Sequence, residues 1–225
     1  MNRTKILALG VAILILSLSV LLILFFRSTE EPANFDGVTR VACMGDSNTE
    51  VTGYPADLQT KLGANYSVGN FGSTGATVLL DTDGPYLNRD AFKNATDFQP
   101  NIVVIMLGTN DARTNIYMSI DHFVDDYVKL IREVQQFKSK PKIWLATPPP
   151  IFDNNLSLSS EYLTDGVIPR IRRVATIVGL PLIDVYSTLA THSEYFSDGV
   201  HVNSAGAEII ASEVFKGISR STYSR

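Results

Sequence analysis

Hydrophobic and polar positions divide the chain into one continuous apolar stretch at its start and a region of shorter alternating segments after it. Residues 6–26 carry no charge and are interrupted only by Gly10, Ser17 and Ser19. A helix of that length rises about 31 Å, which matches a bilayer hydrocarbon core of about 30 Å. The pattern therefore predicts a transmembrane helix over Ile6–Phe26.

The charges that flank this stretch predict its orientation. Arg3 and Lys5 precede it, and Arg27 follows with two glutamates close behind, so the positive-inside rule places the N-terminus in the cytoplasm. A cleaved signal peptide has a shorter apolar region of about 7–15 residues. We therefore expect residues 1–27 to act as an uncleaved signal anchor with the remaining chain outside the cytoplasm, the alternative being a protein secreted after cleavage.

Short β-branched runs recur along the rest of the chain. Residues 28–37 are polar and predict a linker, and residues 38–225 predict one domain, because a chain of roughly 200 residues buries a good single core. The runs that predict strands are Val38–Met44, Tyr66–Phe71, Ile102–Leu107, Lys142–Thr147 and Pro181–Val185.

Longer segments of helical periodicity separate these strands. Apolar residues recur at helical spacing over 123–134 and over 168–178. A last helix is expected after Asn203 as its N-cap, with Ile209, Ile210 and Val214 facing inward. Alternating strands and helices predict a three-layer α/β/α sandwich around a five-stranded parallel sheet. In such folds ligands bind at the carboxyl ends of the strands.

Composition and charge narrow the classes of partner. The formal net charge is −4, and all 23 acidic residues follow residue 26 without any dense Lys/Arg cluster, so nucleic acid is not an expected partner. The single cysteine, Cys43, excludes an internal disulfide and is expected in the core. Three histidines spell out no zinc site, so we expect no metal or cofactor, although a carboxylate-only site for a hard cation stays open.

Polar clusters that suit acyl transfer follow the predicted strands. Acyl transfer by serine needs a nucleophile, a base, an acid that orients the base, and donors for the developing oxyanion. Ser47 is the candidate nucleophile, His201 the base, Asp198 the orienting acid and Asn110 a donor to the oxyanion. Each of them alone is equally typical of a turn, a helix cap or a surface residue, and only the combination favours catalysis.

Other residues compete for these roles. Asp46 and Asp111 are rival acids, but a spacing of three in a loop lets Asp198 reach the His201 ring, so the rivals are expected to shape turns. His122 and His192 are expected on the surface.

Four blocks in this order resemble the SGNH hydrolase, or GDSL-type esterase, superfamily. They are Gly45–Thr49, Asn70–Thr77, Gly108–Asp111 and Asp198–His201. The resemblance implies a flavodoxin-like hydrolase fold and a catalytic triad of Ser47, Asp198 and His201. It also implies an oxyanion hole formed by the Ser47 N–H, a glycine N–H of the second block and the Asn110 amide.

The resemblance selects Gly75 over Gly72 as that glycine, since the family's glycine lies about five positions after an asparagine that closes the second strand. One departure is Asn48, where the family often has leucine, and it affects the expected pocket shape and not the chemistry. The α/β-hydrolases are excluded, because their Gly-x-Ser-x-Gly elbow would need glycine where Thr49 stands.

The expected function is a serine esterase that hydrolyses short acyl esters, acetyl above all, of small molecules or glycans. Within the superfamily the pattern is most similar to bacterial-type carbohydrate O-acetylesterases such as sialate or xylan deacetylases. A lysophospholipase or thioesterase, a glycan O-acyltransferase and an inactive binding domain are the alternatives. Pocket walls are expected from Leu79–Phe92 with Tyr86, from the Tyr54–Pro55 turn and from Thr147–Asp165. The sequence predicts no oligomeric state.

Overall fold

The computed structural model describes residues 37–222. The predicted transmembrane segment Ile6–Phe26 and nearly all of the predicted linker lie outside the described residues. Within residues 37–222, none of the helices is both long and apolar enough to cross a bilayer.

Strands and helices alternate along the described chain. The strands are β1 (Thr39–Gly45), β2 (Tyr66–Gly72), β3 (Ile102–Met106), β4 (Lys142–Ala146) and β5 (Leu182–Ile183). The α-helices are α2 (Ser47–Glu50), α3 (Tyr54–Leu62), α4 (Asp90–Phe98), α5 (Phe123–Gln135), α6 (Ile168–Val178), α7 (Val185–Leu189) and α8 (Ser204–Thr222). A π-helical turn over Tyr162–Val167 leads into α6.

The five strands form one parallel sheet in the order β2-β1-β3-β4-β5. The chain builds outward from β1 to β2 on one side and then returns to place β3 on the other side of β1. The carboxyl ends of β1 and β3 therefore form the topological switch point, where open α/β sheets bind ligands. The predicted fold of the domain, a three-layer sandwich around a parallel sheet, is confirmed.

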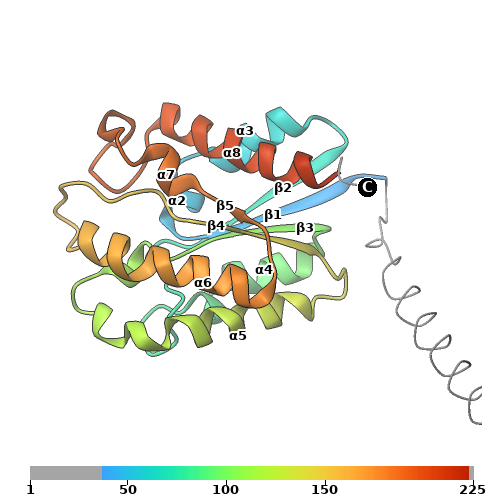
Figure 1. Cartoon of the computed structure of the whole chain (residues 1–225). Coiled ribbons are helices and arrows are strands. Elements are labelled where there is room, and N and C mark those ends of the chain that lie inside the picture. Colours follow the sequence, from blue (N-terminus) through green and yellow to red (C-terminus); the bar gives the residue numbers. More distant parts are fainter. Residues whose placement is uncertain (1–36, 223–225) are drawn as a thin grey trace, which may run out of the picture. The chain divides into compact units, whose positions relative to one another are not determined.

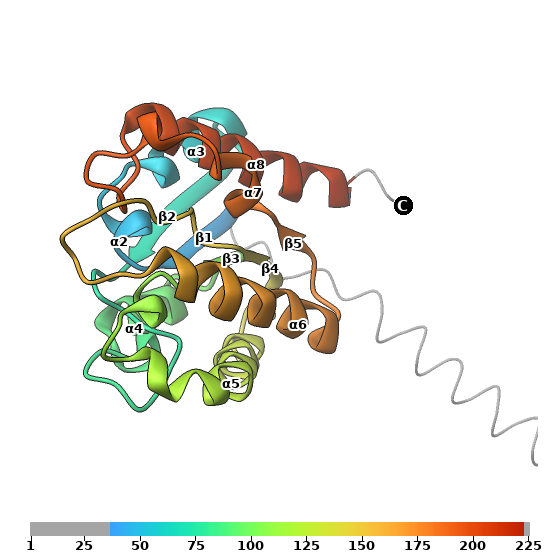
Figure 2. The ribbon, with the colours of Figure 1, turned by 60° about the vertical axis from the view of Figure 1, so that its left-hand side comes forward.

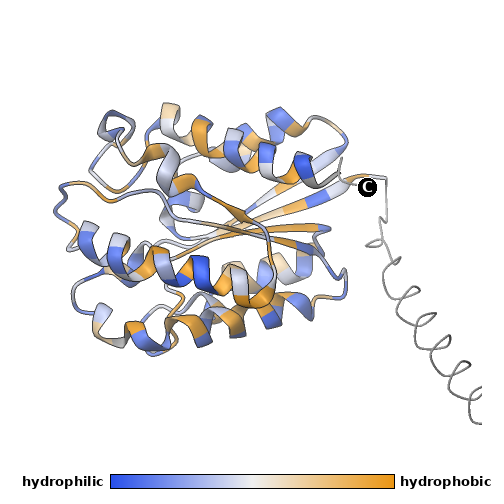
Figure 3. Cartoon of the chain, in the orientation of Figure 1, coloured by the Kyte–Doolittle hydropathy of each residue, from blue (hydrophilic) through white to orange (hydrophobic). Residues whose placement is uncertain are grey.

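Helices cover both faces of the sheet, with α3, α7 and α8 on one face and α4, α5 and α6 on the other (Figure 1). Side chains that alternate along each strand enter the two cores in turn: Val41 and Cys43 lie in one core, and Ala42 and Met44 in the other. The central strand β3 is buried along its whole length and apolar throughout, whereas the edge strand β2 is partly exposed and carries polar residues; the strands in Figure 3 accordingly show both orange and blue.

The last strand is shorter than its sequence pattern predicts. Only Leu182 and Ile183 pair with β4, because Asp184 turns the chain and caps α7 by accepting from the Ser187 N–H at 3.1 Å. The start of α8 agrees with the prediction, since the Asn203 side chain accepts from the N–H groups of Ala205 and Gly206. Cys43 is fully buried, also as predicted.

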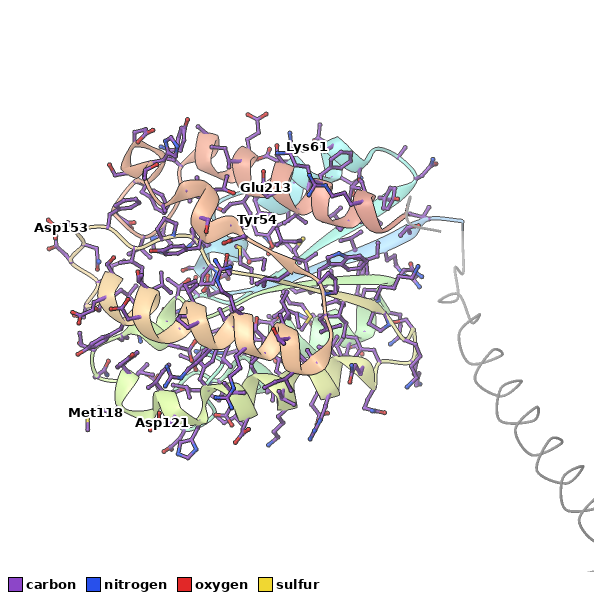
Figure 4. The ribbon with its side chains drawn as sticks, in the orientation of Figure 1. Tyr54, Lys61, Met118, Asp121, Asp153 and Glu213 are labelled. Carbon is purple, nitrogen blue, oxygen red and sulfur yellow. The ribbon has the colours of Figure 1, made fainter. Side chains whose placement is uncertain are left out.

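All five strands point toward the same end of the domain. Figure 2 turns this end forward and shows α2 beside the tips of β1 and β2. The loops that follow β4 and precede α8 lie at this end, and Asp153 marks the tip of the former (Figure 4). The elements thus bring residues far apart in sequence to one edge of the sheet.

Candidate active site

The turn after β1 presents Ser47 at the start of a short helix. Asp46 caps α2 by accepting from the Asn48 N–H at 2.9 Å, and Ser47 is the first residue of that helix. A side chain at Gly45 would meet the Met106 carbonyl oxygen at 2.7 Å, so only glycine lets β1 pack against β3 at the turn. Ser47 is consequently held rigidly, and it is only 5% exposed.

A hydrogen-bonded chain of three side chains runs from this serine. The Ser47 Oγ lies 2.8 Å from His201 Nε2, and His201 Nδ1 lies 2.7 Å from Asp198 Oδ2. The other carboxylate oxygen, Asp198 Oδ1, accepts from the N–H groups of Val200 and His201 at 3.0 and 2.8 Å. One carboxylate therefore fixes both the loop and the imidazole that it carries.

The environment of Asp198 keeps it ionised. Partial burial raises its pKa, but the backbone and ring hydrogen bonds of His201 and the Val200 N–H outweigh that effect and hold the pKa below its ordinary value. A negative carboxylate at this position favours the imidazole tautomer with its proton on Nδ1. His201 Nε2 is then free to accept the Ser47 proton.

Asn48 connects the nucleophile to the loop that carries the base. Its side chain is buried, with Nδ2 donating to the Val200 carbonyl at 3.1 Å and Oδ1 accepting from the Val202 N–H at 3.2 Å. These two hydrogen bonds hold the backbone on either side of His201. Asn48 therefore fixes the distance between α2 and the His201 loop, a role that the sequence reasoning missed.

The loop after β2 leaves one backbone donor free. Gly75 adopts a positive φ of 76°, which favours glycine. The neighbouring N–H groups all have acceptors: Gly72 donates to Asn70 Oδ1, Ser73 to the Gly45 carbonyl, Thr74 to Glu50 Oε2 and Ala76 to the Ser73 carbonyl. Among residues 72–76, only the Gly75 N–H donates to no acceptor of the described chain. This geometry favours Gly75 over Gly72 as an oxyanion donor.

Asn110 joins the end of β3 to the Gly75 loop. Its Nδ2 donates to the Ala76 carbonyl at 3.0 Å, and its Oδ1 accepts from Arg113 Nη2 at 3.1 Å. The side chain is 4% exposed. Gly108 stands two residues earlier with a φ of 132°, where a Cβ would meet the Val167 side chain at 2.8 Å.

Within residues 37–222, neither rival acid forms a hydrogen bond or an ion pair with His201. Asp111 is buried and accepts from the N–H groups of Val78 and Leu79 at 2.9 to 3.1 Å, so it holds the segment that follows Gly75. Burial raises the pKa of Asp111 to about 7, against the lowering effect of those N–H groups. Burial also raises the pKa of Asp46, which caps α2. Both aspartates shape turns, as expected.

Two of the residues expected to line the pocket do not do so. Tyr54 and Tyr86 are buried and do not line a wall: Tyr54 lies in the core (Figure 4), and the Tyr86 hydroxyl donates to the Phe71 carbonyl at 2.6 Å. Burying such a large ring in the core stabilises the fold, so packing and not ligand binding determines where these two side chains lie. Within residues 37–222, no three His, Cys, Asp or Glu side chains are placed to hold a metal ion.

Polar grooves border two of the loops that follow the strands. One, of about 400 Å³, adjoins the Gly75 loop, and its lining includes Ser73, Arg89, Asp90 and Asn94. The other, of about 420 Å³, lies beside Asp198 and is bordered by residues 153–156 and 197–199.

A parallel sheet with a Ser–His–Asp chain and an asparagine amide at its switch point defines the class of SGNH-type hydrolases. Sequence comparison agrees: residues 43–209 match the model of the GDSL-like Lipase/Acylhydrolase family, and the chain belongs to that family.

Individual proteins resemble this chain in sequence or in fold. An acetylxylan esterase from Xylanibacter ruminicola is 35% identical in an alignment of 213 positions. The alignment covers 81% of this chain and 44% of the relative, so the chain spans less than half of that protein. Among solved structures, the aryl esterase of M. smegmatis has a TM-score of 0.66 at 18% identity, covering 81% of this chain and 99% of its own. The acetyl xylan esterase AlAXEase has a TM-score of 0.65 at 21% identity, covering 80% and 99%.

Proposed function

We propose that the chain is a serine esterase that removes short acyl groups, acetyl above all, from carbohydrate esters through an acyl-enzyme intermediate. The observation that carries this proposal is the continuous chain from Ser47 Oγ through His201 to Asp198, with bonds of 2.8 and 2.7 Å. Such a chain prepares a serine for attack before any substrate binds.

Each step has a named residue. Ser47 Oγ attacks the ester carbonyl carbon as its proton passes to His201 Nε2. The resulting oxyanion accepts from the N–H groups of Ser47 and Gly75 and from Asn110 Nδ2. His201 then protonates the leaving alcohol oxygen as the C–O bond breaks. In the second half, His201 takes a proton from water as the water oxygen attacks the acyl carbon. His201 then returns that proton to Ser47 Oγ as the bond between Oγ and the acyl carbon breaks, which releases the carboxylic acid and restores the resting enzyme.

The polar grooves support a glycan ester over a lipid. A long acyl chain needs a continuous apolar wall, whereas hydroxyls, amides and charges of both signs, such as Ser73, Asn94, Arg89 and Asp90, suit the hydroxyl groups of a sugar. The name of the acetylxylan esterase relative points to the same substrate class. A lysophospholipase or thioesterase, a glycan O-acyltransferase and an inactive binding domain remain the competing functions.

Rates on p-nitrophenyl esters of increasing acyl length, and on acetylated xylo-oligosaccharides, test this proposal. We expect kcat/KM to be highest for acetate or butyrate and to fall with each longer chain. A maximum at octanoate or beyond would indicate a lipid substrate. Acyl transfer to an added sugar in place of water would indicate a transferase.

A matched pair of variants tests the glycan. Asn94→Ala removes an amide from the groove, and Lys93→Ala removes an exposed neighbour on α4 that does not line it. We expect only the former to raise KM for acetylated xylo-oligosaccharides, by about threefold to tenfold, the value of roughly one hydrogen bond. Neither should change the rate on p-nitrophenyl acetate. Equal KM values for both variants would contradict glycan binding in this groove.

We further propose that the protein is a single-pass membrane protein with its N-terminus in the cytoplasm and its catalytic domain outside. The uncharged stretch Ile6–Phe26 and the charges that flank it support this topology. After a carbonate wash, the full-length protein should stay in the membrane pellet, and deletion of residues 1–27 should release esterase activity into the soluble fraction. Release of the full-length protein, or a mature chain that lacks residues 1–27, would overturn the anchor.

A further inference from the structure

The amide of Asn110 can serve an oxyanion hole in only one of its two orientations. The amide nitrogen must face the oxyanion, because the carbonyl oxygen of the same side chain would repel it. Rotation by 180° exchanges the two groups at little steric cost. Something in the structure must therefore determine which orientation Asn110 adopts.

The two partners of Asn110 determine it jointly. Arg113 Nη2 lies 3.1 Å from Oδ1, and a guanidinium can only donate. The Ala76 carbonyl lies 3.0 Å from Nδ2 and can only accept. A flipped amide would place donor against donor and acceptor against acceptor. With both partners present, one N–H of Nδ2 binds Ala76, and the second has no bonded acceptor within residues 37–222.

Within residues 37–222, no carboxylate competes with Asn110 for the Arg113 side chain. Its guanidinium forms no ion pair with any residue in the described range 37–222, so its charge is not neutralised by a neighbouring carboxylate. Its backbone is fixed independently, by a bridge to Leu158 and by a carbonyl that accepts from the N–H groups of Ile116 and Tyr117. The loop therefore does not depend on the side chain for its conformation.

We propose that Arg113 is a positioning residue of the active site, which fixes the orientation of the Asn110 amide and polarises it toward the oxyanion. The inference rests on the proposed serine esterase function. A cation on Oδ1 draws electron density from the amide and strengthens the remaining N–H as a donor. The transition state carries more negative charge on its oxygen than the ester carbonyl does, so the effect falls on kcat and leaves KM nearly unchanged.

The test uses the full-length protein in mild detergent with p-nitrophenyl acetate as the substrate. Arg113→Met is expected to lower kcat by about 10-fold with KM within about twofold, a smaller loss than the roughly 10²–10³-fold that deletion of an oxyanion donor causes. Arg113→Lys, which retains a cationic donor, should recover part of the rate. Arg132→Met replaces an exposed arginine of α5 and serves as the control, with no change expected.

A double-mutant cycle separates positioning from general destabilisation. If Arg113 acts through Asn110, Arg113→Met should change the rate by less than about twofold in an Asn110→Ala background. The rate of inactivation by a fluorophosphonate, whose phosphoryl oxygen occupies the same hole, gives a second readout where turnover is low. Two results would overturn the inference. One is that Arg113→Met lowers the rate as much in the Asn110→Ala background as in the wild type, and the other is that the single variant has an unchanged kcat. Activity that does not depend on Ser47 would instead refute the proposed function itself.

Discussion

Replacing Ser47 with alanine is expected to lower kcat for acetyl esters by at least about 10⁴-fold. The substitution removes the Oγ that bonds His201 Nε2 at 2.8 Å and leaves no alcohol to form an acyl-enzyme. The fold should be unaffected, because Asp46 and not Ser47 caps α2. Steady-state kinetics and a thermal unfolding curve on the same preparation measure both effects.

Ser193→Ala is a matched control for that experiment. Ser193 is an exposed serine of the loop that precedes α8, eight residues before His201, and its loss should change neither rate nor stability. If Ser47→Ala kept more than about a tenth of the wild-type rate, another group would have to be the nucleophile.

Asp198→Asn is expected to lower kcat by about 10⁴-fold while the loop keeps its shape. Asparagine retains the oxygen that accepts from the Val200 and His201 N–H groups, so the turn survives. Its amide nitrogen, however, replaces the oxygen 2.7 Å from His201 Nδ1. That nitrogen donates, so Nδ1 must accept and the ring proton moves to Nε2. His201 then offers Ser47 a donor and cannot take its proton.

The pH dependence of this defect follows from the low pKa of Asp198. A carboxyl group whose pKa is lower in the folded protein contributes stability that is complete above its unfolded pKa of about 3.9 and is lost as pH falls through the folded value. Because Asp198 stays ionised between about pH 5 and pH 8, it should hold the productive tautomer of His201 across that range, and Asp198→Asn should stay far slower than the wild type at every pH within it. Asp97→Asn, on the exposed side of α4, is the control. A ratio of wild-type to Asp198→Asn rates that collapses toward one within that range would contradict the tautomer argument.

The parallel sheet could be predicted because its signals are local. Buried strands such as β3 and β4 are continuous apolar runs bounded by polar turns, and helices such as α5 repeat apolar residues at helical spacing. The fifth strand was predicted too long, since apolar Val185 continues the pattern although Asp184 ends the strand as a helix cap. A helix cap depends on a single residue, so the periodic pattern of a strand does not reveal it.

The meeting of Ser47, His201 and Asp198 could be predicted because ordered blocks at strand ends converge at one edge of a parallel sheet. The structure brings these three side chains together and places Asn110 against the Gly75 loop. The residues that align them were not found. The bonds of Asn48 to the His201 loop span more than 150 positions of the sequence, so no local pattern signals them.

The burial of two tyrosines was also not predicted. Tyr54 and Tyr86 were expected at the pocket because the segments that carry them follow predicted strands, yet both are buried with their hydroxyls near polar atoms of the core. Sequence position alone does not tell whether a tyrosine ring fills a core or faces a ligand. Tertiary packing decides that question.

The central claim is that Ser47 is an activated nucleophile, and covalent labelling tests it most directly. Full-length protein treated with a fluorophosphonate should gain the mass of one adduct, and peptide mapping should place that adduct on Ser47. His201→Ala, which removes the base, should label far more slowly. An adduct on another residue, or a folded wild-type protein that takes no label, would contradict the account.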